Sequence, residues 1–175
     1  MAVTQSESRS KSRTSAKSTA RNATPDAIKL LKADHDEVEG WFEDFEKTNS
    51  DSKKQKLANQ ICTALKVHTQ IEEEIFYPAC REAGIEEDMM DEADVEHQGA
   101  KNLIAEIEAG GPGDDHWDAK VTVLGEMIKH HVKEEEQRDG MFAKAKKADL
   151  DLDELGAELK ARKDQLMRGY KNSKQ

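Results

Sequence analysis

A histidine followed four residues later by a glutamate occurs twice in this chain, within carboxylate-rich helical sequence, as His68–Glu72 and His131–Glu135. Residues i and i+4 lie one turn apart on the same face of an α-helix, so each pair directs an imidazole and a carboxylate the same way. A single histidine precedes each pair well upstream, at His35 and at His97. Two such pairs and two single histidines could surround two metal ions in the middle of a helical bundle.

Each of these histidines lies on the apolar stripe of a predicted helix. Apolar residues recur every three or four positions in four stretches of the chain, which predicts four long amphipathic helices. The first opens at Thr24-Pro25-Asp26, the second spans about residues 52–83, the third follows Gly84, and the fourth opens near Asp114. With short connections between them, these helices predict an all-α fold, an antiparallel up-down-up-down four-helix bundle.

Three further features complete the predicted organisation. Pro78 should kink or end the second helix, because proline removes one backbone hydrogen bond and crowds the preceding turn. An Asp151…Glu154 capping arrangement predicts a short C-terminal fifth helix outside the bundle. The predicted division is a disordered basic tail rich in Ser, Thr and Ala (1–24), the bundle (25–148), and an accessory helix with its tail (149–175).

Two carboxylates, Glu72 and Glu135, fall on the apolar stripes, where an unpaired charge costs several kcal/mol. Arginine partners are scarce, whereas metal coordination would account for all four histidines and both glutamates together. Imidazole nitrogens and carboxylate oxygens suit iron, with manganese as the alternative, and a carboxylate can bridge two such ions. We expect the neighbouring acidic residues to be solvated; these are Glu73, Glu74, Glu134 and Glu136. We expect Tyr77 to be a packing residue.

The register of the last pair has an alternative. His130 and Glu134 also satisfy the i, i+4 spacing, on the stripe of Val123 and Met127. We prefer His131–Glu135, because this pair continues the stronger apolar stripe that starts at Trp117.

The combined spacing resembles the hemerythrin-like (HHE cation-binding) family over roughly residues 25–148. The matching segments are Asp34-His35, His68-Thr-Gln-Ile-Glu72-Glu73 leading to Phe76-Tyr77-Pro78, Glu96-His97, and His130-His131-Val-Lys-Glu134-Glu135. The resemblance implies a non-heme di-iron centre with bridging carboxylates inside an antiparallel four-helix bundle. The ligands that it implies are His35, His68, Glu72, His97, His131 and Glu135.

The chain also departs from this family pattern. Oxygen-carrying hemerythrins use five histidines and close the site with HxxxxD, whereas this chain has four well-placed histidines and HxxxE, which argues against reversible oxygen carriage. Ala143 stands near where many relatives have Phe-Pro, so we expect the last bundle helix to run on without a break.

Charge and composition limit the partners. The 175-residue chain has a net charge of −10. Residues 1–24 hold five basic residues against Glu7, a net of +4, so the remaining residues carry −14. Such an acidic body argues against nucleic acid as the main partner, while the basic tail could contact an acidic protein.

No apolar run approaches the ~18–20 residues that span a bilayer, and no signal peptide follows the first charges. Two cysteines are too few for a framework of disulfide bonds and fit a reducing compartment, so we expect a cytosolic protein.

These observations favour a di-iron protein that binds, senses or scavenges a small ligand such as O2, NO or peroxide, or that handles iron. Peroxidase-like turnover is a weaker variant, because no separate substrate pocket or acid–base pair is visible in the sequence. The alternative is a helical protein-interaction module in which a metal is structural or absent. A zinc-stabilised bundle is disfavoured, because six nitrogen and oxygen ligands exceed the four that are usual for structural zinc. The sequence leaves the oligomeric state open.

Overall fold

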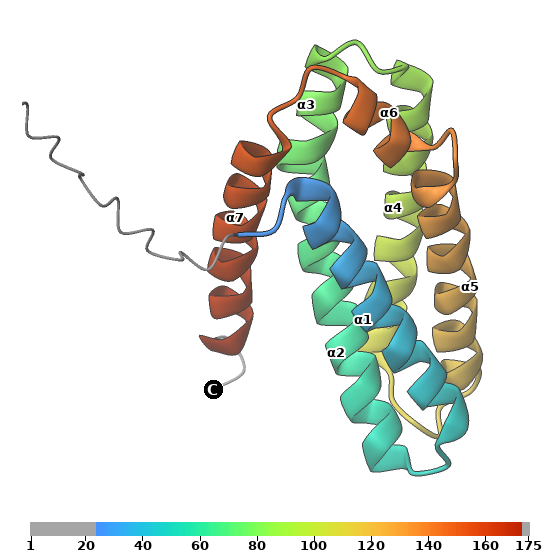
Figure 1. The fold of residues 1–175 in the computed structure, drawn as a ribbon. Coiled ribbons are helices and arrows are strands. Elements are labelled where there is room, and N and C mark those ends of the chain that lie inside the picture. The colour runs from blue at the N-terminus through green and yellow to red at the C-terminus, as the bar shows by residue number, and fades with distance from the viewer. Residues whose placement is uncertain (1–23, 173–175) are drawn as a thin grey trace, which may run out of the picture.

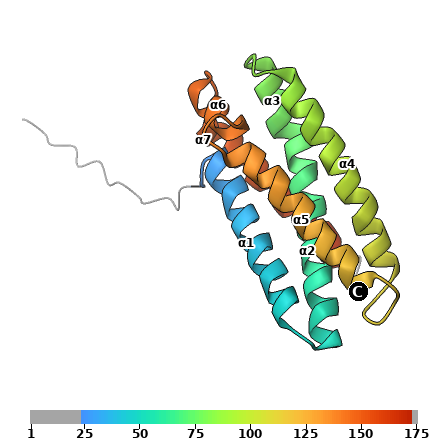
Figure 2. The same ribbon diagram turned by 90° about the vertical axis from the view of Figure 1, so that its right-hand side faces the viewer.

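The computed structural model describes residues 24–172 and places a four-helix bundle at the centre of the molecule. Helix α1 (Ala27–Lys47) runs down, α2 (Asp51–Ile71) runs up, α4 (Glu87–Ala109) runs down and α5 (Trp117–Glu136) runs up, as Figure 1 shows. The second view shows the same alternation (Figure 2). The predicted all-α, up-down-up-down bundle is confirmed, whereas the predicted basic tail lies almost wholly outside the described residues.

Helix α1 begins later than the sequence suggested. Asp26, rather than Thr24, caps this helix, and its carboxylate accepts a hydrogen bond of 2.9 Å from the Lys29 N–H. Ser50 caps α2 in the same way through the Lys53 N–H. Both caps satisfy backbone donors that a helix start would otherwise leave unpaired.

The chain stays helical through Pro78. After α2, it forms one π-helical turn, η1 (Glu72–Phe76), and continues as α3 (Tyr77–Glu82). In this turn the Tyr77 N–H bonds to the Glu72 carbonyl five residues back. The prediction that Pro78 ends or kinks the helix did not include this π turn. The turn lies directly before the proline, and its wider backbone gives the proline ring room that a regular α-helical turn would not give.

Two apolar clusters lie at opposite ends of the bundle, and a buried polar layer separates them. Along α1, Leu31 belongs to the upper cluster and Val38 to the lower, with His35 between them. Helices α2 and α4 repeat this order of an apolar residue from one cluster, a histidine, and an apolar residue from the other cluster, whereas on α5 the second apolar residue lies beyond the end of the helix. The flanking pairs are Leu65 and Ile71 on α2, Ala93 and Ala100 on α4, and Leu124 and Met141 on either side of the α5 histidine.

Helix α5 ends at Glu136, so the expectation that it runs on was wrong. A short loop leads to α6 (Met141–Lys147), which folds back over the upper end of the bundle and buries Phe142. Gly140 permits this reversal, because a Cβ there would collide with the backbone oxygens of Glu134 and Glu135.

The fifth helix, α7 (Leu152–Asn172), has 21 residues, so the expectation of a short helix was wrong. Its predicted cap is present: the Asp151 carboxylate accepts a 2.9 Å hydrogen bond from the Glu154 N–H. Figure 1 shows α7 running beside α1 and α2. Buried Leu155 and Leu159 hold its first half on the upper core, and this packing stabilises a helix longer than its few apolar residues suggest. The predicted boundary at residue 148 stays a prediction.

Among residues 24–172, no helix is both long and apolar enough to cross a membrane.

Gly156 sets how closely α7 approaches the start of α1. A Cβ at this position would lie 2.8 Å from the Ala27 nitrogen and closer still to the Pro25 carbonyl oxygen. We expect Gly156→Ala to lower the free energy of unfolding by about 1–3 kcal/mol, as overpacking does, and to make α7 more sensitive to protease. Gly169→Ala on the same helix is the control, because its Cβ would meet nothing within 4 Å. Equal unfolding midpoints for the two variants in urea would contradict this role of Gly156.

Candidate metal centre

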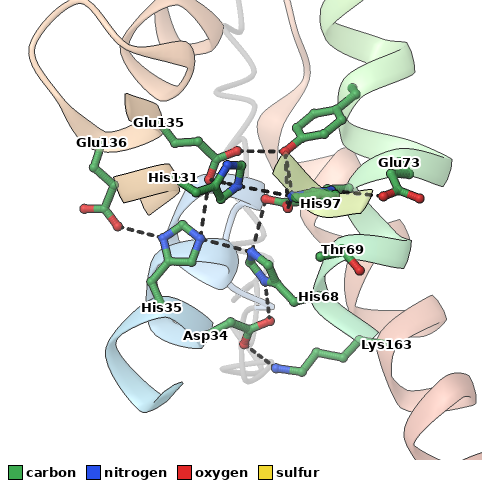
Figure 3. A network of polar contacts seen from close by, with 12 residues as sticks. Asp34, His35, His68, Thr69, Glu73, His97, His131, Glu135, Glu136 and Lys163 are labelled. Atoms are coloured by element: carbon green, nitrogen blue, oxygen red, sulfur yellow. Dashed lines mark hydrogen bonds and ion pairs between the residues drawn. The ribbon is translucent and has the colours of Figure 1, made fainter. Parts of the chain in front are cut away.

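The six residues singled out by the sequence converge in the polar layer between the two apolar clusters. Each of the four bundle helices supplies one histidine (Figure 3), and all six side chains are buried. The members are His35 from α1, His68 from α2, Glu72 from η1, His97 from α4, and His131 and Glu135 from α5.

The four imidazoles form two pairs whose Nε2 atoms face each other. The Nε2 atoms of His35 and His68 are 3.0 Å apart, and those of His97 and His131 are 3.2 Å apart. Glu72 reaches both pairs with different oxygens: Oε1 lies 3.2 Å from His68 Nε2, and Oε2 lies 3.4 Å from His97 Nε2. The two halves of the site are therefore joined through one carboxylate.

Glu135 lies between the same two imidazole pairs. Its Oε2 atom lies 3.4 Å from His35 Nε2 and 3.7 Å from His131 Nε2. Together with Glu72, it brings a second carboxylate to the space that the four Nε2 atoms surround.

The outer nitrogen of each imidazole faces a carboxylate from a neighbouring helix. A carboxylate of α1 contacts the histidine of α2, one of η1 contacts that of α4, one of α4 contacts that of α5, and one of α5 contacts that of α1. These four carboxylates therefore form an outer ring around the bundle. The Nδ1–carboxylate distances are 3.3 Å for His68–Asp34, 3.0 Å for His97–Glu73, 2.7 Å for His131–Glu96 and 2.8 Å for His35–Glu136. A histidine that donates through Nδ1–H presents the lone pair of Nε2 to the centre, as metal-binding histidines do.

The expectation that Glu73 and Glu136 are simply solvated was wrong, since both belong to this ring. Each ring carboxylate directly adjoins one of the six central residues in sequence, yet it serves a histidine on another helix. Adjacent helical positions point about 100° apart, so sequence alone does not give the partner.

Three of the four ring carboxylates also pair with a lysine on their outer side. Glu136 pairs with Lys32, Glu73 with Lys101 at 2.6 Å, and Asp34 with Lys163 of α7. The last contact ties the accessory helix to His68 through one carboxylate (Figure 3).

The inner geometry fits a bound cation. Oε1 of Glu72 and Oε2 of Glu135 are buried and have no hydrogen-bond partner among the described residues. Two Nε2 lone pairs 3.0 Å apart repel each other unless a proton or a metal lies between them. One atom from each of His35, His68, Glu72 and Glu135 lies within 4.8 Å of the others, and the same holds for Glu72, His97 and His131. Nitrogen and oxygen donors of this kind suit iron or manganese.

Without a cation, protons must occupy the same positions. Burial opposes charge on His68, but Glu72 and Asp34 raise its pKa to about 10. Burial and the neighbouring Glu72 raise the pKa of Glu135 to about 8, while burial lowers the pKa of His35 to about 4. At neutral pH, protons therefore lie on His68 and Glu135, where a metal would displace them.

Tyr77 also belongs to the centre, so its expected role in packing alone was wrong. Its hydroxyl donates to Glu135 Oε1 at 3.1 Å and lies 3.4 Å from Glu72 Oε2 and 3.3 Å from His97 Nε2. Burial and both carboxylates hold its pKa well above the usual value, so the hydroxyl keeps its proton. In an α-helix, residues five apart point about 140° apart; the π turn brings Tyr77 and Glu72 together.

The structure also distinguishes the two registers at the end of α5. His131 and Glu135 are buried in the centre, whereas the His130 side chain is 63% exposed and contacts Glu134 at 3.2 Å. The preferred pair therefore faces the core.

The outer ring should set metal affinity. Asp34→Asn removes the charge that orients His68, and we expect it to weaken Mn²⁺ binding by about tenfold or more, as loss of outer-shell partners does. Asp36→Asn is the matched control, because Asp36 is exposed on the same helix. Titration followed by the EPR signal of free Mn²⁺ measures both affinities, and equal values would contradict the ordering role of Asp34.

Metal uptake should release protons at neutral pH. The pKa values of His68 and Glu135 both lie above 7, so each group must lose a proton before it binds a cation. The apparent affinity should therefore rise as the pH is raised from about 6 to about 8. A pH-indicator dye in weakly buffered solution records the released protons, and an affinity independent of pH with no proton release would contradict this assignment.

Comparisons with known proteins bear on the fold and on the family of this chain. The family model of the hemerythrin HHE cation binding domain matches residues 26–145. A crystal structure of a hemerythrin HHE cation binding domain-containing protein from Mycobacterium kansasii superposes with a TM-score of 0.67 at 24% identity, covering 81% of this chain and 87% of that one. A protein from Nostoc sp. described as a DNA nickase is 30% identical over 107 residues, which are 61% of this chain but only 30% of that protein. The family match spans most of the chain and includes all six central residues: this protein belongs to the hemerythrin HHE cation-binding family.

Proposed function

We propose that this chain binds two iron ions, one beside each histidine pair, and uses them to bind, sense or scavenge O2, NO or peroxide, or to handle iron. The observation that carries this proposal is the position of Glu72, whose two oxygens face opposite histidine pairs. A carboxylate placed in this way suits two cations better than one. Manganese is the alternative metal, since the same donors suit it.

The chain's own residues would hold the metals and keep the centre dry. His35 and His68 form one nitrogen pair and the other two histidines form the second, while Glu72 and Glu135 balance the positive charge between them. Bound iron would supply redox chemistry and open coordination positions for a small ligand. The outer carboxylates fix the imidazole orientations, and the apolar clusters above and below limit access of water.

The space beside the histidines favours a ligand of few atoms. A cavity of about 10 Å³ is lined by all four histidines, and it has room for roughly one water-sized molecule. Its apolar walls are Val38, Leu65, Ile128 and Val132. Such a cavity suits a ligand of very few atoms, such as a diatomic molecule.

Tyr77 gives the proposed centre a proton donor. Its hydroxyl stays protonated between Glu72 and Glu135 and donates to Glu135 Oε1, a hydrogen bond that it would have to exchange in order to donate to a ligand. This observation supports peroxide turnover as a second candidate function.

DNA nicking is outside this proposal. The matched stretch covers 30% of the Nostoc protein, and the acidic body of this chain would repel phosphate groups.

Anaerobic loading with ferrous iron tests the proposal. We expect the purified full chain to retain about two iron ions, as the two-pair geometry requires, and to change its absorption spectrum after oxidation and azide addition. Both His68→Ala and the milder Glu72→Gln should reduce iron retention, while His116→Asn should not, because His116 is exposed at the far end of α5 in a left-handed conformation that Asn tolerates. Circular dichroism checks that each variant folds.

Less than one iron per chain and a spectrum unchanged by azide would contradict the proposal. A thermal unfolding midpoint unmoved by chelator, together with wild-type stability of His68→Ala, would favour a helical interaction module in its place.

A further inference from the structure

One of the four carboxylates of the outer ring, that of Glu96, differs from the other three in its partner on the solvent side. The carboxylates of Asp34, Glu73 and Glu136 each pair with a lysine, which neutralises them on the solvent side. Glu96 instead faces the imidazole of His130, whose Nε2 lies 3.5 Å from Glu96 Oε1. Among residues 24–172, neither Glu96 nor the nearby Glu134 forms an ion pair with a lysine or arginine. This quarter of the ring therefore lacks the lysine that pairs with each of the other three carboxylates.

The residues in this quarter have the types and spacing of a metal site. His130 and Glu134 form the second HxxxE pair of α5, with Nε2 and Oε1 3.2 Å apart, and Glu96 joins them from α4. One donor atom from each of the three lies within 4.8 Å of the others. Two carboxylates and one imidazole suit ferrous iron or manganese, and the exposed position suits fast exchange with solvent.

A hollow is lined by residues of both the outer cluster and the buried centre. It has a volume of about 110 Å³, and its lining includes Glu96, His131, Glu134 and Glu135. Glu135 is 2% exposed, and its Oε2 atom has no hydrogen-bond partner among the described residues. Glu135 therefore belongs both to the lining of the hollow and to the buried centre, where its Oε2 atom faces the Nε2 atoms of His35 and His131.

Glu96 joins the outer cluster to the inner one. Its Oε1 atom faces His130, while its Oε2 atom accepts a hydrogen bond of 2.7 Å from His131 Nδ1–H. A cation held by the outer three side chains would therefore lie next to the carboxylate that orients an inner histidine.

We propose that Glu96, His130 and Glu134 form an outer, weakly binding site for a divalent transition-metal ion and that this site delivers the ion to His131 and Glu135. The inference rests on the proposed function, because it assigns the route by which the buried centre is filled. The local negative charge raises the concentration of cations at the mouth of the hollow, which speeds loading without adding to the final occupancy.

Loading kinetics test this route. The metal-free full chain is mixed anaerobically with ferrous iron at low concentration, quenched with chelator at set times, and analysed for retained iron. We expect His130→Asn and Glu134→Gln to slow the initial rate by about tenfold, within the range of electrostatic steering, with unchanged final iron content. The matched controls are His116→Asn and Glu126→Gln, which change an exposed histidine and an exposed glutamate on or beside the same helix.

A second readout is independent of kinetics. EPR titration of the wild-type chain with Mn²⁺ should show one weak site beyond those of the buried centre, and both His130→Asn and Glu134→Gln should abolish it. Initial rates equal to wild type, an equal slowing in the controls, a reduced final iron content or the absence of the weak site would each overturn the inference. Failure of the wild-type chain to retain iron at all would instead overturn the proposed function.

Discussion

Four inward-facing imidazole lone pairs and two buried carboxylates need positive charge among them, and the rest of this structure follows from that need. The Nε2 atoms are paired at 3.0 and 3.2 Å, and one oxygen of each glutamate lacks a hydrogen-bond partner among the described residues. Protons can meet the requirement in part, which is why the pKa values of His68 and Glu135 are raised. A pair of metal ions would satisfy all six groups at once, and burial would then strengthen their binding in place of opposing it.

The outer ring turns this local requirement into a constraint on the whole bundle. Because each carboxylate of the ring orients a histidine on another helix, every bundle helix is tied to the next at the same depth. Helix α7 joins this arrangement through Lys163 and Asp34, although it lies beyond the residues that match the family. Glu96, which forms no ion pair with a lysine among residues 24–172, lies where the cluster of His130 and Glu134 meets the solvent.

Helical periodicity was enough to predict the bundle and to bring the six central residues to one layer, since i, i+4 spacing places side chains on one face regardless of tertiary contacts. It was not enough to predict contacts between helices, which is why Glu73 and Glu136 were expected to be solvated. The position of Tyr77 depends on a π turn, and the reversal at Gly140 depends on where α6 packs. Local sequence carries little information on either, because both arise from packing of the folded chain. The length of α7 was missed for the same reason, as its few leucines gain stability only on the surface of the bundle.

The central claim is that two metal ions lie within the layer of six buried side chains, and anomalous X-ray diffraction from crystals of the iron-loaded protein, at the iron absorption edge, tests it most directly. The account predicts two anomalous peaks inside the ring, one beside His35 and His68 and the other beside His97 and His131, with Glu72 reaching both. A core without anomalous density, or iron bound only at the surface of the bundle, would contradict it.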